Sequence, residues 1–145
     1  MAHVWLLLLY KLPSEPTSRR VYIWRKLKRL GAILLHDAVW LLPDTAFTRE
    51  QFQWLAAEIG EMGGEAWLWE SRLGLAGQEE ALVQQFVEQI DAAYRAILNE
   101  LKQEDCDLAA LSRRYQQIKM EDYFHSELGR QAREALISAR GGRET

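Results

Sequence analysis

The chain has 145 residues, a net charge of −3, 48% hydrophobic residues and 27% charged residues, which is ordinary for a single globular domain with its own core. Cys106 is the only cysteine, so no internal disulfide can form, and this fits a reducing compartment. The apolar run near the start is too short to span a bilayer and lacks the flanks of a signal peptide, so we expect a cytoplasmic protein without a membrane partner.

The charge is unevenly distributed along the chain. The first 42 residues carry seven basic and two acidic side chains, a balance of +5, whereas the remainder has a balance of −8. The net charge would weakly repel nucleic acid, but a concentrated basic surface near the start could still attract it.

The first elements are predicted from hydrophobic periodicity. Residues 4–10 form a continuous apolar run, typical of a central strand. Residues 18–30 have helical spacing and end at Gly31. Two short apolar runs, 32–35 and 38–42, then predict a tight hairpin.

A second helix and a fourth strand follow. The segment 48–51 matches a capping box, with Phe47 and Phe52 as a hydrophobic staple. The helical stripe continues to Met62, and residues 65–72 alternate as in a strand. The order predicts an α+β, ferredoxin-like β-α-β-β-α-β unit over residues 1–75.

The rest of the chain, residues 76–145, is predicted to be a helical extension packed on that unit. Apolar residues repeat every three or four positions over residues 78–102, and two shorter stripes follow. These stripes need a partner surface, which is why we expect the packing.

Several segments together resemble the N-terminal domain of the chromate-resistance regulators of the ChrB type. The opening Trp5–Pro13 and the run Arg20–Ala32 are similar to that family, and Ala38–Thr45 follows at the expected distance. The resemblance is completed by three further segments, Phe52–Leu55, Gly63–Ala66 and Arg113–Ile118.

The resemblance implies a transcriptional regulator of chromate resistance, with DNA (an operator) as its partner and DNA binding in this domain. In that family a second, C-terminal domain follows, and this chain is too short to hold it, so we expect a stand-alone relative or one half of a split protein. The order of elements also resembles CRISPR-associated nucleases of ferredoxin-like fold. That family places a metal-binding aspartate after the first strand, where this chain has Lys11.

The strongest functional signal is a basic set within the first predicted helix. Such side chains can neutralise phosphates, and arginine pairs with phosphate or base edges through two hydrogen bonds. The alternatives are an ordinary solvated helix face and a site for a small oxyanion such as chromate. The predicted DNA-binding residues are Arg19, Arg20, Arg25, Lys26, Lys28 and Arg29.

No other constellation carries chemistry. The basic residues of 113–133 lie among acidic ones, so we expect pairing within their helices. The three histidines are scattered, and no serine has a nucleophile-elbow context. We therefore expect no catalytic residues, no metal, no cofactor and no enzymatic activity.

Six tryptophans are many for this length, and interfaces are enriched in tryptophan. Trp67 and Trp69 lie two apart on the fourth predicted strand and share a face, which the extension or a second subunit could cover. The alternative function is therefore a protein-interaction module that forms a homodimer or partners a separate sensor protein.

Overall fold

The computed structural model describes residues 3–144, which divide into two compact units, one up to Glu79 and one from Glu80 onward. That the helical extension packs on the first unit stays a prediction. The elements, in chain order, are β1 (Trp5–Lys11), α1 (Thr17–Arg29), β2 (Ile33–Leu35), β3 (Val39–Pro43), α2 (Ala46–Glu61), β4 (Glu65–Ser71), α3 (Gln78–Glu100), α4 (Leu108–Met120) and α5 (Glu127–Glu144).

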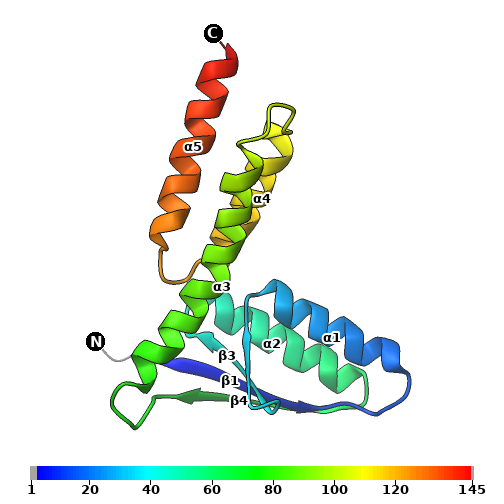
Figure 1. The fold of residues 1–145 in the computed structure, drawn as a ribbon. Coiled ribbons are helices and arrows are strands. Elements are labelled where there is room, and N and C mark those ends of the chain that lie inside the picture. The colour runs from blue at the N-terminus through cyan, green and yellow to red at the C-terminus, as the bar shows by residue number, and fades with distance from the viewer. Residues whose placement is uncertain (1–2, 145) are drawn as a thin grey trace. The chain divides into compact units, whose positions relative to one another are not determined.

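The first unit holds a four-stranded sheet in the order β2-β3-β1-β4, and every neighbouring pair is antiparallel. Helices α1 and α2 lie side by side over this sheet (Figure 1). The predicted mixed α+β class is confirmed. The predicted apolar run forms β1, which is central because it pairs with β3 on one side and β4 on the other.

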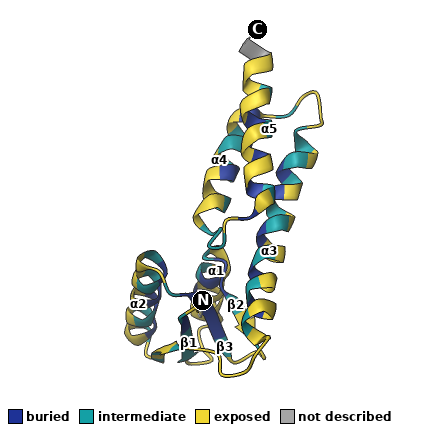
Figure 2. Cartoon of the chain, turned by 90° about the vertical axis from the view of Figure 1, so that its left-hand side faces the viewer, coloured by how far each residue is buried: buried dark blue, intermediate teal, exposed yellow. Residues whose placement is uncertain are grey.

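Helices α1 and α2 cover only one of the two faces of the sheet. Leu6 lies opposite Glu70 of β4, and Glu70 accepts a hydrogen bond from Arg49 of α2, so this face is the one that the helices cover. Leu6 and Leu8 on this face are completely buried, and the buried side of α2 is turned toward the strands (Figure 2). The other face carries Trp67 and Trp69 of β4.

Positive backbone φ angles mark the turns at which elements end. Gly31 follows α1 with φ 78°, and Gly63 follows α2 with φ 84°, so both helices stop where the sequence predicts. His36 and Asp37 form the tip of the β2–β3 hairpin with φ 53° and 58°. The Ala38 amide donates to the Leu35 carbonyl across that tip at 3.1 Å.

The start of α2 differs from the prediction. The N-cap is Thr45, three residues earlier than expected, and its hydroxyl accepts from the Thr48 amide at 3.0 Å. The Thr48 hydroxyl in turn accepts from the Thr45 amide and donates to the Pro43 carbonyl at 2.6 Å. The predicted box at 48–51 is therefore wrong. So is the Phe47–Phe52 staple, because Phe47 lies in the first turn of the helix rather than before it.

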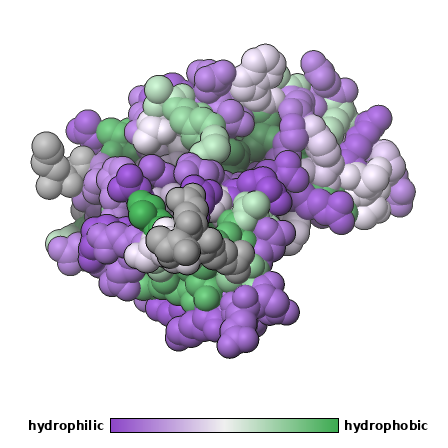
Figure 3. Space-filling model, turned by 90° about the horizontal axis from the view of Figure 1, so that it is seen from above, coloured by the Kyte–Doolittle hydropathy of each residue, from purple (hydrophilic) through white to green (hydrophobic). Residues whose placement is uncertain are grey.

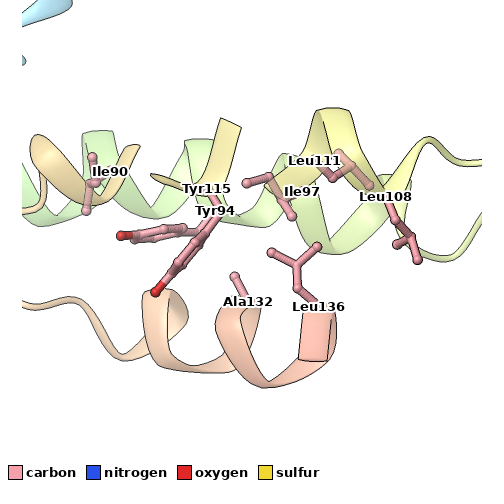
Figure 4. Packing of buried hydrophobic residues seen from close by; sticks show 8 residues of the cluster. All are labelled: Ile90, Tyr94, Ile97, Leu108, Leu111, Tyr115, Ala132 and Leu136. Carbon is pink, nitrogen blue, oxygen red and sulfur yellow. The ribbon is translucent and has the colours of Figure 1, made fainter. Parts of the chain in front are cut away.

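The second unit is a packing of three helices. Its core joins the buried side chains of α3, α4 and α5 around Tyr94 and Tyr115, whose ring centroids are 5.9 Å apart (Figure 4). No helix in the described part of the chain is long and apolar enough to cross a membrane. The buried cluster consists of Ile90, Tyr94, Ile97, Leu108, Leu111, Tyr115, Ala132 and Leu136.

Candidate nucleic-acid interface

All six predicted DNA-binding residues lie on α1. The helix buries Ile23 and Leu27, which are completely inaccessible, and this fixes which sides of the helix remain open. Its last turn carries Lys26, Lys28 and Arg29, where positive charge is favourable beside the helix C-terminus. The structure nevertheless places the six side chains in three different environments.

Lys26 is turned toward α2. Its ammonium forms an ion pair with Glu58 at 2.8 Å and lies 4.8 Å from the centre of the Tyr22 ring. The hydrogen bond to Glu58, followed by Tyr22, raises the pKa of Lys26. Burial is the largest single effect and acts to raise the pKa of Glu58, but the hydrogen bonds with Lys26 and Tyr22 and the charge of Lys26 together outweigh it, so the net pKa is lowered. This charge is already compensated within the protein.

Arg19 and Arg20 lie on the two flanks of the buried side of α1. Arg19 donates to the Met62 carbonyl at 3.1 Å and so satisfies an acceptor at the end of α2. Arg20 lines a cavity of about 300 Å³ together with Tyr10 and Trp24. Burial raises the pKa of Tyr10, against opposing effects of a hydrogen bond from Trp40 and the charge of Arg20.

The open side of α1 presents the remaining cations. Arg25, Lys28 and Arg29 are exposed, and within residues 3–144 none of the three forms an ion pair. Lys28 lies 5.9 Å from the centre of the Trp24 ring, which is itself 50% exposed. We call these residues, Arg25, Lys28 and Arg29 with the exposed aromatics Tyr22 and Trp24, the α1 surface.

One aromatic residue beside this surface was missed by the sequence reasoning. Trp54 of α2 is 61% exposed and lines a groove of about 230 Å³ together with Lys26 and Arg29 of α1. The signal was present, because Trp54 lies off the buried stripe formed by Phe52 and Leu55. On the face shown in Figure 3, hydrophilic side chains separate smaller hydrophobic areas.

The second basic cluster only partly follows the prediction of pairing within helices. Arg130 pairs with Glu127 and Glu134 of its own helix, as expected. For Arg114 the prediction is wrong, because its partner is Glu100 of α3 at 2.8 Å. Arg113, Lys119 and Arg133 form no ion pair among the described residues.

Ligands suited to a metal ion do not gather in the described part of the chain, where no group of three or more histidine, cysteine, aspartate or glutamate side chains could hold one. Two carboxylates of the first unit are engaged in ion pairs with basic side chains. Asp44 accepts two hydrogen bonds from Arg49, and Glu58 is paired with Lys26. The hydrogen bonds that Arg49 donates to Glu70, and then those to Asp44, raise the pKa of Arg49.

Comparison with known proteins gives a family match that begins within α1 and runs to the end of α3. A family described as "Protein ChrB, N-terminal" matches residues 20–100. The chain is also similar to "Protein ChrB" of Cupriavidus metallidurans, with 33% identity over 95 residues, which is 66% of this chain and 26% of that protein. The chain thus spans about a quarter of the relative's length. No solved structure matches.

Proposed function

Because this chain belongs to the family of ChrB N-terminal domains, we propose that it is a DNA-binding regulatory module of the chromate-resistance type. The observation that carries the proposal is the set of exposed, uncompensated cations Arg25, Lys28 and Arg29 on one helix. Phosphate contacts of this kind supply essentially all of the non-specific affinity of proteins for DNA and a large share of the specific affinity. We propose a cytoplasmic protein that works by binding rather than by catalysis.

The six basic residues divide into two roles. We assign direct phosphate contact to Arg25, Lys28 and Arg29, and to Arg20 on the flank of α1. Arginine holds a phosphate through two parallel hydrogen bonds, whereas lysine acts as a point charge. Lys26 and Arg19 join α1 to α2 through Glu58 and Met62, so their role is to hold the helix in a fixed orientation.

The test is a titration of the whole chain with a labelled fragment of its own upstream region, with random DNA for comparison, at low and physiological salt. The variant R25Q/K28Q/R29Q removes the three exposed charges. If each contacts a phosphate, the slope of log affinity against log salt should fall by about 0.9 per residue, or roughly 2.7 in all. The single variant K26Q should change the slope much less.

A matched control removes three charges elsewhere. Arg95, Lys102 and Arg113 are exposed and lie in the second unit, so R95Q/K102Q/R113Q changes the net charge by the same amount. An R25Q/K28Q/R29Q variant that folds normally and binds with an unchanged salt slope would refute the assignment. An equal loss in the control would show that only net charge matters.

A second candidate function is that of an association module, and the tryptophans of β4 favour it. Trp67 is 61% exposed and Trp69 is 54% exposed, on the sheet face opposite α1 and α2. Tryptophan is common where protein surfaces bury each other. We propose a second copy of the chain, or a separate sensor protein, as the partner of this face.

The association candidate is tested by the mass of the particle in solution. Light scattering after gel filtration should find the wild-type chain as a dimer at high concentration, and W67S/W69S as a monomer. W24S/W54S, which removes two exposed tryptophans from the helices, is the control that should leave the dimer intact. If W67S/W69S has the mass of the wild-type dimer, the chain does not form a homodimer through this face.

We also propose that the first unit is ferredoxin-like. The order β1-α1-β2-β3-α2-β4 and the uniformly antiparallel neighbours support this arrangement. It brings two helices to one face of a sheet and leaves the other face to be covered by something else. The exposed β4 tryptophans are what such an architecture leaves available for a partner.

A further inference from the structure

The second unit contains a cavity that the DNA-binding proposal does not use. It has a volume of about 420 Å³ and is lined by side chains of α3, α4 and α5 and of the loop between α4 and α5. None of its residues belongs to the α1 surface. We call it the extension cavity, and its lining includes Tyr94, Tyr115, Lys119, His125 and Arg133.

The inner wall of the cavity is aromatic. Tyr94 is 1% exposed and Tyr115 is 6% exposed, and their rings lie side by side with both hydroxyl groups on the same side (Figure 4). The Tyr94 hydroxyl donates to Asp122 at 3.0 Å. Within the described residues, no hydrogen bond engages the Tyr115 hydroxyl. The wall therefore offers two aromatic rings inclined at 39° to each other and one available polar group.

Both acidic side chains of the lining already have partners. Asp122 accepts hydrogen bonds from the Tyr94 hydroxyl and from the Ser126 amide at 3.0 Å; both donors are neutral, so Asp122 keeps its negative charge. Glu127 is paired with Arg130, and this hydrogen bond, more than the opposing effect of burial, lowers the pKa of Glu127. Among the described residues, neither carboxylate forms an ion pair with Lys119 or Arg133.

Three nitrogen-bearing side chains are left at the rim. Lys119 of α4, His125 of the loop and Arg133 of α5 line the same cavity and are exposed, and their side chains form no ion pair or hydrogen bond within residues 3–144. His125 has a φ of 54°, a left-handed conformation that histidine adopts more readily than most residues. The lining combines an aromatic wall with the two cations Lys119 and Arg133, which have no ion-pair partner among the described residues.

We propose that the extension cavity binds a small organic anion. Its aromatic or aliphatic body would lie against the tyrosine wall, and its carboxylate, sulfonate or phosphate group would bind Lys119 and Arg133, with the Tyr115 hydroxyl and His125 as further donors. Such a division, mostly apolar walls with a few polar groups that fix orientation, is typical of ligand sites, and charge-assisted hydrogen bonds supply the selectivity.

The experiment uses two dyes of similar shape and different charge on the whole chain. Anilinonaphthalene sulfonate carries an aromatic body and an anionic group, and its fluorescence rises in an apolar site. Phenylnaphthylamine lacks the sulfonate. We expect the sulfonate dye to saturate one site per chain, with an affinity at least about tenfold above that of the neutral dye, as one well-placed charged contact provides.

Variants locate the site. K119Q/R133Q should weaken binding of the sulfonate dye at least about tenfold while leaving the thermal unfolding midpoint unchanged. R95Q/R113Q removes two exposed charges from α3 and α4 outside the cavity and should bind the dye as the wild type does. Unchanged binding by K119Q/R133Q, equal loss in R95Q/R113Q, or equal affinity for the neutral dye would each overturn the proposal. So would displacement of the dye by inorganic sulfate at concentrations as low as those of the dye itself, because the aromatic wall would then contribute nothing.

Discussion

Gly129 allows the packing of the second unit to be tested with a single added methyl group. Gly129 is buried in the first turn of α5, where its Cα faces the ring of Tyr94. A Cβ built at this position would lie 2.8 Å from two carbons of that ring and 3.0 Å from its hydroxyl oxygen. Tyr94 is 1% exposed and held by Asp122, so the ring has little room to withdraw.

The structure and helix propensity predict opposite effects of G129A on the free energy of unfolding. Replacing a helical glycine with alanine ordinarily stabilises a protein by up to about 1 kcal/mol. Forcing extra volume into a packed core costs about 1–3 kcal/mol. Because real Cβ atoms do not approach other atoms within 3.0 Å, the second effect should dominate, and G129A should lose about 1–2 kcal/mol of unfolding free energy.

Urea denaturation followed by circular dichroism measures this difference, and the same helix contains its control. Gly141 is also in α5, but a Cβ there would meet nothing within 4 Å, so G141A should be neutral or stabilising. In a background with Tyr94→Leu, the penalty of G129A should shrink, since contacting residues are not additive. Stabilisation of G129A to the same extent as G141A would refute the packing of α5 against Tyr94.

Two further predictions concern pH. The pKa of Glu58 is lowered, so its pair with Lys26 stabilises the fold above the ordinary pKa of 4.5, and this stabilisation is lost as the pH falls below that value. E58Q should therefore flatten the acid limb of the curve of stability against pH by less than about 1 kcal/mol, as read from urea midpoints across pH. Burial, and then the hydrogen bond to Asp122, raises the pKa of Tyr94 above its ordinary 10.0, so the stability of the fold should fall once the pH exceeds 10.0. Y94F should reduce this alkaline loss of stability. A urea midpoint at alkaline pH that is the same in Y94F as in the wild type would contradict the prediction.

Hydrophobic periodicity and glycine placement predicted the elements well. The strand Trp5–Lys11 and the helix Thr17–Arg29 were expected within a residue or two, because a continuous apolar run and a three-to-four spacing have different periods. The family resemblance read from the same segments is confirmed. These features are local, so a short segment of the sequence is enough to recognise each strand, helix or family motif.

Register and pairing between distant residues could not be predicted in the same way. Thr45 and Thr48 are both suitable N-caps; in the folded chain Thr45 takes the cap, and the Thr48 hydroxyl donates to the Pro43 carbonyl. Lys26 and Glu58 are 32 residues apart, so nothing local indicated that this lysine would be compensated. The extension cavity draws its lining from three helices, and periodicity along one helix cannot show what another contributes.

The two candidate functions use opposite faces of the first unit and therefore do not exclude each other. The α1 surface lies on the helix side of the sheet, and Trp67 and Trp69 lie on the other. A dimer formed through the tryptophan face would leave both α1 surfaces open, which suits a DNA site made of two half-sites. The chain would then bind such a site more tightly than either half because the second contact becomes intramolecular. W67S/W69S should accordingly lose affinity for a full site while retaining that for one half-site. Equal loss on both would instead place the tryptophans within the DNA contact itself.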